Sequence, residues 1–274
     1  MSAVAQALDI SRPHLSAMRQ QGPMQRRGRP PLPDADLVAE IRALIMDLPT
    51  YGYRRVHALL RRQAEMHGRA APNQKRIYRV MKLHGLLLAR HSGRGEERRH
   101  DGKVAVAIRN TRWCSDGLEI GCDNGEKVRI AFALDCCDRE AMGFVATTGG
   151  ITAQDVRDLM VTAVEYRFGQ VNRLPHDIEW LTDNGSCYTA RETRSFARSI
   201  GLIPRTTPVE SPQSNGMAEA FVRTIKRDYA RVSPRPDARA VIDQIPNWMA
   251  HYNHVHPHRA LGYRSPREFI ALNP

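Results

Sequence analysis

The hydrophobic pattern of the chain changes its period once, across the segment RHSGRGEERRHDGK at residues 90–103. Before this segment, apolar residues recur every three to four positions, which predicts amphipathic helices. After it, short apolar runs bounded by turn residues predict strands alternating with helices. The segment itself is rich in glycine and charge and holds no large apolar residue. We therefore interpret residues 90–105 as a linker between two differently folded parts.

The charge of the chain is divided at the same place. Residues 1–106 hold 20 Lys+Arg and 9 Asp+Glu, a net charge of +11, whereas residues 107–274 hold 21 and 20, a net charge of +1. A basic half joined to a nearly neutral half predicts a module that binds a polyanion, attached to a second activity. A basic surface that only keeps the protein soluble is the alternative.

The cysteine content argues against a disulfide framework. The five cysteines are an odd number, two of them are adjacent, and no C-x-x-C pair occurs, so neither paired disulfides nor a zinc ribbon is indicated. We expect reduced thiols and a cytoplasmic protein. No apolar run reaches the roughly 18 residues of a membrane span, and no signal peptide opens the sequence, so no membrane partner is expected.

Residues 1–22 predict two short helices broken near residues 9–11, the pattern of a partial helix-turn-helix. Val4, Ala5 and Leu8 form the apolar face expected for the first of them. Other helical hairpins share this pattern, so a simple hairpin is the alternative. Residues 23–33, rich in Gly, Pro and Arg, predict a linker or an arm that enters a DNA minor groove.

Residues 34–89 predict a small all-helical domain with cationic outer faces. The third of its helices follows Pro72–Asn73, and its residues Ile77, Val80 and Met81 are expected to face inward. This helix is the best candidate for the DNA major groove, with a merely solvated basic face as the alternative. The outward cations expected to contact DNA are Arg54 and Arg55 on the second helix and Lys75, Arg76, Arg79 and Lys82 on the third.

Residues 106–232 predict an α/β core, and residues 233–274 predict a helical C-terminal extension of it. Asn124–Gly125 is a strong hairpin signal between two long strands. The helix that begins after Gly216 has one apolar face, formed by Ala218, Phe221, Val222 and Ile225. The strands are expected at 113–123, 127–135, 142–148, 178–182 and 202–205, and the helices at 152–168, 189–200, after 216, at 237–252 and from 266.

Three carboxylates in this core occupy positions that a chemical role explains better than a structural one. Asp116 lies inside the first strand, Asp183 closes the strand W-L-T-D, and Glu219 lies in the first turns of the helix after Gly216. Carboxylates that converge repel one another unless cations neutralise them. Oxygen ligands without His or Cys favour Mg²⁺ or Mn²⁺, and two such ions suit phosphoryl transfer.

Each carboxylate also has a plainer interpretation. Asp116 could be a surface aspartate, and Asp183 could serve only as an Asx-turn residue before Gly185. Glu219 could be an ordinary acid at a helix start, where the helix dipole favours it. Three other acids lie close to the first strand in sequence and compete with Asp116 for its role, namely Asp135, Asp138 and Glu140.

The sequence blocks around these acids resemble a known family. LTDNGSCYTA and SPQSNGMAEAFVRTIKRDY, with 35 residues between Asp183 and Glu219, are similar to the second and third blocks of the retroviral-integrase-like transposase core. YGYRRVHALLRR and NQKRIYRVMKLHGLL resemble the basic helical domain of bacterial insertion-sequence-three transposases, which are made from two overlapping reading frames. WMAHYNHVHPHRALGYRSPREF resembles the C-terminal block of the same family.

The resemblance implies a ribonuclease-H-like core, a mixed five-stranded sheet with flanking helices, preceded by helix-turn-helix-type segments. It implies that Asp116, Asp183 and Glu219 are catalytic ligands of two Mg²⁺ ions, with Mn²⁺ as an alternative, in an enzyme that cuts and joins transposon DNA. The implied partners are terminal inverted repeats, target DNA, further copies of the chain and the upstream-frame product. The residues implied to lie near DNA in the core are Lys226, Arg223, Asn184, Gln213 and Asn215.

Two alternatives to an active transposase stay open. One is a catalytically silent, truncated copy that regulates transposition by binding DNA, and the other is a related nuclease without strand transfer. The pattern H-x-x-H-x-H-x-H, formed by His251, His254, His256 and His258, is compatible with a metal site. Pro257 interrupts it and no cysteine joins it, so a helix end and loop is the favoured interpretation.

Overall fold

The computed structural model describes residues 2–20, 33–89, 106–206 and 216–273. The chain divides into two compact units, Met1–Asp36 and Leu37–Pro274. The first unit contains the helices α1 (Ser2–Ala7) and α2 (Arg12–Gln20), as expected. Only part of the apolar face predicted for α1 is covered, because Ala5 is buried whereas Val4 and Leu8 are exposed. The expectation for Val4 and Leu8 is therefore wrong.

Three helices come next along the chain: α3 (Ala35–Asp47), α4 (Tyr53–Met66) and α5 (Gln74–Leu83). Their shared core includes Ile41, Val56 and Ile77, all fully buried. The Asn73 side chain accepts a hydrogen bond from the backbone N–H of Lys75 at 2.8 Å, which caps α5 at the position that the sequence predicts. We call α3–α5 the helical segment below.

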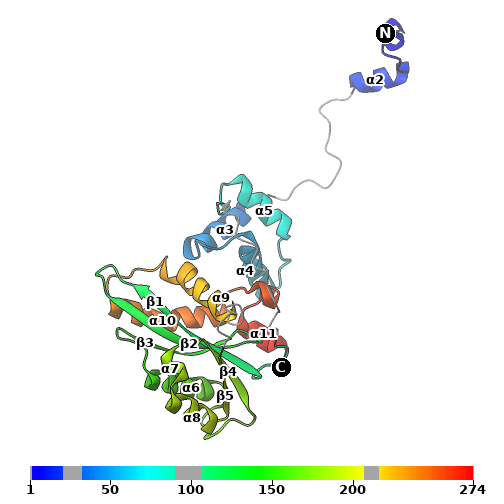
Figure 1. Ribbon diagram of the computed structural model, residues 1–274. Coiled ribbons are helices and arrows are strands. Elements are labelled where there is room, and N and C mark those ends of the chain that lie inside the picture. The colour runs from blue at the N-terminus through cyan, green and yellow to red at the C-terminus, as the bar shows by residue number, and fades with distance from the viewer. Residues whose placement is uncertain (1, 21–32, 90–105, 207–215, 274) are drawn as a thin grey trace. The chain divides into compact units, whose positions relative to one another are not determined.

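The α/β core contains the mixed five-stranded sheet that was expected (Figure 1). Its order is β3-β2-β1-β4-β5; the pairs β3–β2 and β2–β1 are antiparallel, and the pairs β1–β4 and β4–β5 are parallel. The chain turns between β1 and β2 at Asn124–Gly125, where Gly125 has φ +90°, a value that favours glycine. The strands are β1 (Arg112–Gly121), β2 (Lys127–Asp135), β3 (Ala141–Thr147), β4 (Ile178–Thr182) and β5 (Leu202–Thr206).

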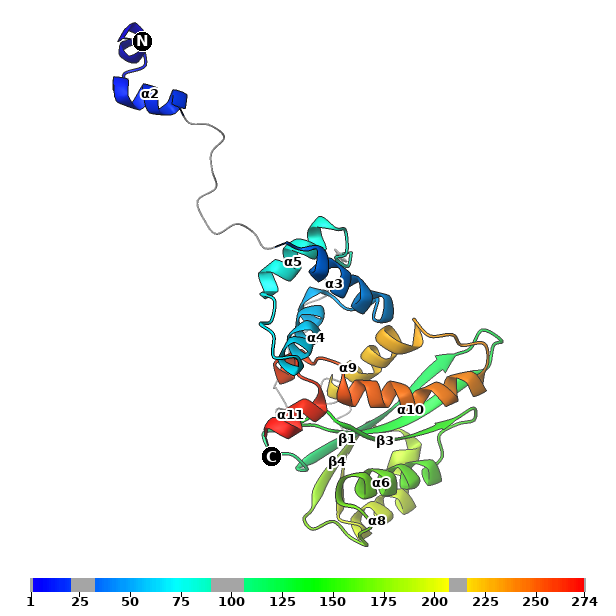
Figure 2. The same ribbon diagram turned by 180° about the vertical axis from the view of Figure 1, so that it is seen from behind.

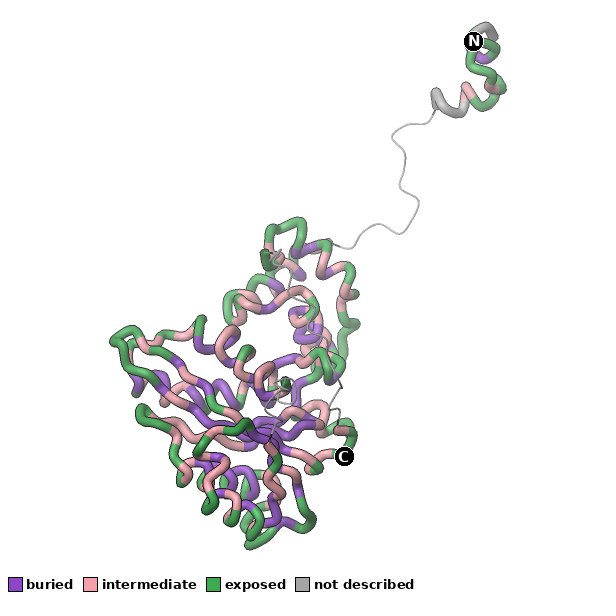
Figure 3. Tube along the Cα trace, viewed as in Figure 1, coloured by how far each residue is buried: buried purple, intermediate pink, exposed green. Residues whose placement is uncertain are grey.

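Helices cover both faces of the sheet, α6 and α8 on one face and α9 and α10 on the other (Figures 1 and 2). Successive strand residues alternate between two cores, as a pleated strand requires. In β2, Ile130 and Phe132 pack toward α9 and α10, whereas Ala131 and Ala133 pack toward α6. Figure 3 shows the resulting buried strands at the centre of the second unit, with exposure concentrated in turns and on outer helix faces.

The remaining helices follow the predicted order, with two differences. The short helix α7 (Ser186–Thr189) precedes α8 (Arg191–Ser199), because the chain breaks its helical path at Ala190. The helix after Gly216 also changes its winding, from α9 (Gly216–Ile225) to the π-helix η2 (Lys226–Ala230). The others are α6 (Ala153–Phe168), α10 (Ala238–His254), the single turn η3 (Arg259–Leu261) and α11 (Pro266–Leu272).

Two expectations about composition can be compared with the structure. All five cysteines are free thiols, and Cys114 and Cys136 are buried. Among the residues that the structure describes, no helix is long and apolar enough to span a membrane.

Candidate active site

The parallel pairing of β1 with β4 brings Asp116 and Asp183 to the same level of the sheet. Cys114 pairs with Leu181, and each aspartate follows its strand neighbour by two positions. Cys114 and Leu181 both pack into the core beneath α9 and α10. Because side chains repeat their direction every second residue, Asp116 and Asp183 are directed toward that same face.

Glu219 approaches this face from α9. Its neighbours Ala218 and Phe221 are buried against the sheet, and the Phe221 ring lies 4.3 Å from the Phe132 ring, centroid to centroid. This packing holds the first turns of α9 over β1 and β2, where Phe132 is paired with Asp116. Glu219 itself is half-buried, so its carboxylate stays accessible beside the packed face.

The ionisation of Asp116 is affected by its burial and by two neighbouring acids. Burial, together with the charges of Asp183 and Glu219, raises the pKa of Asp116 to about 6. A hydrogen bond from the Gly117 backbone N–H, 2.7 Å from Oδ1, opposes the shift. A cation between these carboxylates would relieve the repulsion, because an opposite charge favours the ionised form.

Asp183 stands at the mouth of a tight turn between β4 and α7. Its Oδ1 accepts a hydrogen bond from the Gly185 backbone N–H at 3.0 Å, so the Asx-turn that the sequence allowed is formed. Below it, Tyr188 is buried, and its hydroxyl lies 3.0 Å from the Ser115 Oγ, one residue before Asp116. This contact ties the turn after β4 to the strand that carries the other aspartate.

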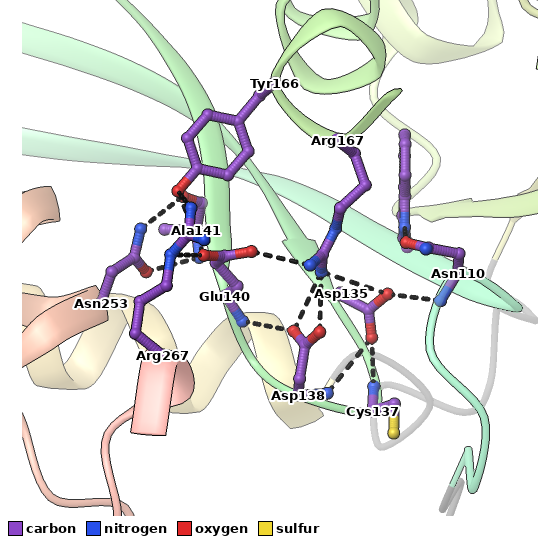
Figure 4. Close-up of polar contacts among 11 residues, drawn as sticks. Asn110, Asp135, Cys137, Asp138, Glu140, Ala141, Tyr166, Arg167, Asn253 and Arg267 are labelled. Carbon is purple, nitrogen blue, oxygen red and sulfur yellow. Dashed lines mark hydrogen bonds and ion pairs between the residues drawn. The ribbon is translucent and has the colours of Figure 1, made fainter. Parts of the chain in front are cut away.

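The acids that compete with Asp116 are committed to another cluster (Figure 4). Asp135, Asp138 and Glu140 are buried and surround Arg167 of α6. Arg167 lies 2.8 Å from Asp138 and 2.7 Å from Glu140. Paired and closed off from solvent, these three carboxylates are structural, which leaves Asp116 as the first acid of the candidate site.

The donor chemistry of the candidate site fits a hard divalent cation. The three carboxylates offer oxygen ligands only, and Asp183 and Glu219 are reachable from solvent. Within the described part of the chain, no group of three or more His, Cys, Asp or Glu side chains is placed so that it could hold a metal ion.

The candidate DNA-binding residues of α5 lie as the sequence predicts. Ile77, Val80 and Met81 are buried in the helical segment, and Lys75, Arg79 and Lys82 are exposed on the opposite side of α5. Arg76 is half-buried. A basic, solvent-facing helix of this kind can reach phosphates in a DNA groove.

The two arginines predicted on α4 have different surroundings. Arg54 is exposed, with its guanidinium 5.0 Å from the Tyr53 ring. Arg55 faces the core instead, where its Nη1 lies 2.9 Å from Oδ2 of the buried Asp228. The outward, solvated position expected for Arg55 is therefore wrong, because Asp228 is a stronger partner than water.

The remaining predicted contacts surround α9. Asn184 is exposed in the turn after β4, Arg223 is exposed near the end of α9, and Lys226 is half-buried at the start of η2. Lys226 follows Glu219 by two helical turns and so shares its side of the helix. Gln213 and Asn215 lie outside the described residues.

Two histidines of the H-x-x-H-x-H-x-H pattern, His251 at the end of α10 and His256 after it, contact tyrosine hydroxyls. His251 Nδ1 lies 2.9 Å from the Tyr229 hydroxyl, and His256 Nδ1 lies 2.8 Å from the Tyr51 hydroxyl. His254 Nδ1 contacts the Ala250 carbonyl oxygen at 2.9 Å. These contacts, in a helix end and loop, agree with the interpretation favoured from the sequence.

Sequence reasoning missed Asp228, whose carboxylate accepts hydrogen bonds from Arg55 and Arg227. A signal was present, because Asp228 is the only acid between Arg223 and Arg235, in a stretch otherwise rich in cations. Arg167 was missed as well. The sequence around Asp135, Asp138 and Glu140 contains no pattern that points to an arginine some 27 residues further along the chain.

The chain is similar to known proteins over nearly its whole length. Models of an integrase core domain match residues 107–212 and 201–266, and a model of an HTH-like domain matches residues 31–94. The transposase InsD for insertion element IS2D of Escherichia coli (strain K12) is 52% identical over 274 residues, which cover 98% of this chain and 90% of the relative. The transposase InsD for insertion element IS2-9 of the same strain is also 52% identical, over 98% of this chain and 89% of its own length.

Among solved structures, the catalytic core domain of BIV integrase is similar with a TM-score of 0.41 and 17% identity, over 60% of this chain and 95% of that one. The relatives of known sequence carry the assignment, since they match nearly the whole chain at high identity. The chain therefore belongs to the insertion-element transposases with an integrase catalytic core, in agreement with its resemblance to the insertion-sequence-three family.

Proposed function

We propose that Asp116, Asp183 and Glu219 hold two Mg²⁺ ions, or Mn²⁺ in their place, and that the enzyme uses them to cut transposon ends and join them to target DNA. The observation that supports this most directly is the convergence of three carboxylates, from β1, the end of β4 and α9, on one face of the sheet. Polynucleotidyl transfer is the class of activity of this family, and the metal and its ligands are the proposal.

Bound metal would lower the pKa of a coordinated water and neutralise charge on the reacting phosphate. The residues of the chain then have separate tasks. The three carboxylates hold the cations, and the Asp183–Gly185 turn with the Tyr188–Ser115 contact fixes the two aspartates relative to each other. In the first step the oxygen of water bonds to phosphorus and the 3′ oxygen leaves. In the second, that 3′-hydroxyl attacks a target phosphodiester and displaces another 3′ oxygen.

DNA is proposed to bind along two surfaces. The exposed cations of α5 would hold the terminal inverted repeat, while Lys226, Arg223 and Asn184 would contact the nucleotides near the cut. Joining both transposon ends requires two active sites on one DNA complex, so we propose a homo-multimer on DNA, with the upstream-frame product as a further partner.

The decisive experiment is a joining assay with oligonucleotide duplexes of the transposon end, with and without Mg²⁺. We expect Asp183→Asn to abolish cleavage and joining while DNA binding stays intact or becomes tighter, because a negative charge near the phosphates is removed. Asp243→Asn is the matched control, since it removes the same charge from an exposed position on α10.

Each outcome of this assay has a clear meaning. Full joining by Asp183→Asn would overturn the assignment of the three carboxylates. Wild-type protein that binds the ends but neither cuts nor joins them in either metal would favour the silent regulator, and cutting without joining would favour a nuclease.

A further inference from the structure

The helical segment is attached to the catalytic core by a charged contact beside the active-site helix. Arg55 of α4 donates to Asp228 at 2.9 Å, and Asp228 lies in η2, which continues directly from the helix of Glu219. The Asp228 side chain has no exposed surface, and that of Arg55 is 22% exposed. A cation predicted for DNA is thus directed into the protein.

Neutralising Asp228 does not require Arg55. Arg227 already binds the same carboxylate at both oxygens, with its Nε and Nη2 each at 2.6 Å. Burial pushes the pKa of Asp228 upward, but the hydrogen bonds from Arg227 and the charge of Arg55 outweigh it and lower that pKa. Arg55 is therefore a second cation beside the Asp228 carboxylate, which Arg227 already pairs. Arg55 comes from α4, whereas Arg227 is in η2 with Asp228.

Further contacts around the Arg55–Asp228 pair define how α4 is joined to η2. The Tyr51 hydroxyl lies 2.8 Å from His256 Nδ1, and Arg55 lies over the Tyr51 ring at 5.1 Å from its centroid. On the other side of η2, the Tyr229 hydroxyl contacts His251 of α10 at 2.9 Å. The residues Asp228 and Tyr229 thus hold η2 between α4 and α10.

The helical winding of η2, where this contact is made, is unusual. An α-helix that turns into a π-helix places one extra residue in its turn, a feature that is found often at functional sites. Here the change begins at Lys226, seven residues after Glu219, and ends at Ala230. Asp228, which contacts α4 through Arg55, therefore lies on the same continuous helix as Glu219.

We propose that Asp228 and Arg55 are positioning residues that set the distance between DNA held by the helical segment and the active-site carboxylates. This rests on the proposed function, in which α5 holds the transposon end and Glu219 holds metal. The ion pair fixes the register in which the end enters the site, so that the phosphodiester at the transposon boundary is the one that reacts.

The test uses the full chain, duplexes of the transposon end and Mg²⁺. Arg55→Ala is compared with Arg54→Ala, which removes the same charge from the adjacent, exposed position of α4. The readouts are folding by circular dichroism, affinity for the duplex at several salt concentrations, the joining rate at saturating DNA, and the nucleotide at which each product was cut.

For Arg55→Ala we expect affinity within about twofold of wild type and an unchanged salt slope, because no phosphate contact is lost. The joining rate at saturating DNA should fall about tenfold or more, since a small misplacement of the reacting groups is costly. Cuts should spread over neighbouring nucleotides, an effect that mere loss of folded protein does not produce. Arg55→Lys should restore part of the rate and the correct cutting position.

Asp228→Asn should reproduce the spread of cutting positions, and the double variant Arg55→Ala/Asp228→Asn should be no worse than the more defective single one. If Asp228→Asn does not fold, Arg55→Ala and Arg55→Lys test the proposal alone.

The proposal is overturned if Arg55→Ala joins at the wild-type rate and position, or if it loses affinity and salt slope as a DNA-contacting cation would. Failure of the proposed function is distinguishable, because the wild-type protein would then show no metal-dependent joining.

Discussion

Arg167 Nη2 lies 2.8 Å from Asp138 Oδ2, in a cluster where one guanidinium serves three buried carboxylates. Arg167 also lies 2.7 Å from Glu140 and 3.5 Å from Asp135. Glu140 binds Arg267 of α11 in addition, so the cluster joins the end of β2, the start of β3, the end of α6 and the C-terminal helix (Figure 4).

Truncating Arg167 should destabilise the core severely. Arg167→Ala leaves Asp135 and Asp138 buried without their cation, and breaking a buried pair in this way costs roughly 3–5 kcal/mol. We expect the free energy of unfolding, measured by urea denaturation, to fall by about that amount. Arg239→Ala is the control, because the exposed pair of Arg239 with Asp243 should be worth less than about 1 kcal/mol. Equal losses in the two variants would refute a structural role for the cluster.

A methyl group added at Gly185 should impair catalysis without unfolding the protein. Its Cβ would lie 3.0 Å from Asp183 Oδ1 and 3.4 Å from the Tyr188 ring, while the backbone, at φ −56°, tolerates alanine. The Asp183 carboxylate must then shift, and we expect Gly185→Ala to lower the joining rate about tenfold.

Gly117 provides the matched control, since it also lies beside an aspartate of the candidate site. A Cβ at Gly117 meets nothing within 4 Å, so Gly117→Ala should keep the wild-type joining rate. Both variants are assayed for joining and for thermal unfolding. A Gly185→Ala protein that joins as fast as Gly117→Ala would show that the Asp183 turn has room to adjust.

Much of the fold follows from local pattern, because the strands and helices of the core are long and strongly periodic. Asn124–Gly125 predicts its hairpin from turn chemistry alone, and the faces of α5 follow from residues such as Ile77 and Val80. Of the site, the sequence points to Asp116, Asp183 and Glu219 as candidates, and the parallel register of β1 and β4 shows how the two aspartates come to lie on neighbouring strands.

The rest depends on contacts between residues that are distant in the sequence. Arg55 looked like one more outward cation of α4 until packing placed it on Asp228, which is 173 residues away. The change to π-helical winding at Lys226 has no local signal, since Ile225 and Lys226 continue an ordinary helical pattern. Contacts in the folded protein therefore determine the position of Arg55 and the winding at Lys226, which helix propensity and hydrophobic periodicity do not predict.

Acid should destabilise the protein through a half-buried histidine, His258. Burial, together with the charges of Arg139 and Arg55, lowers the pKa of His258 to about 3. A histidine with a depressed folded-state pKa stabilises fully above its unfolded pKa of about 6.5, and that stability is lost as the pH falls below this value. Between pH 6.5 and pH 5 we expect the free energy of unfolding to drop by about 1–2 kcal/mol on account of His258.

Urea denaturation of His258→Gln at both pH values should show a smaller drop than wild type. His251 and His256, whose pKa values are also lowered by burial, keep part of the pH dependence. His254→Gln changes an exposed histidine of the same stretch and should leave the wild-type pH dependence. An identical drop in His258→Gln and wild type would remove His258 as a source of acid sensitivity.

Single truncations on α5 should weaken DNA binding uniformly. Lys82 is exposed on the cationic side of α5, where it can neutralise one phosphate and release the counterion bound there. Lys82→Ala should reduce the slope of log affinity against log salt by about 0.9, and the loss of affinity should be similar for duplexes of different sequence. Arg239→Ala removes an exposed charge from α10 and should leave the slope unchanged. If Lys82→Ala keeps the full salt slope while Arg239→Ala lowers it, the DNA lies on another surface of the protein than α5.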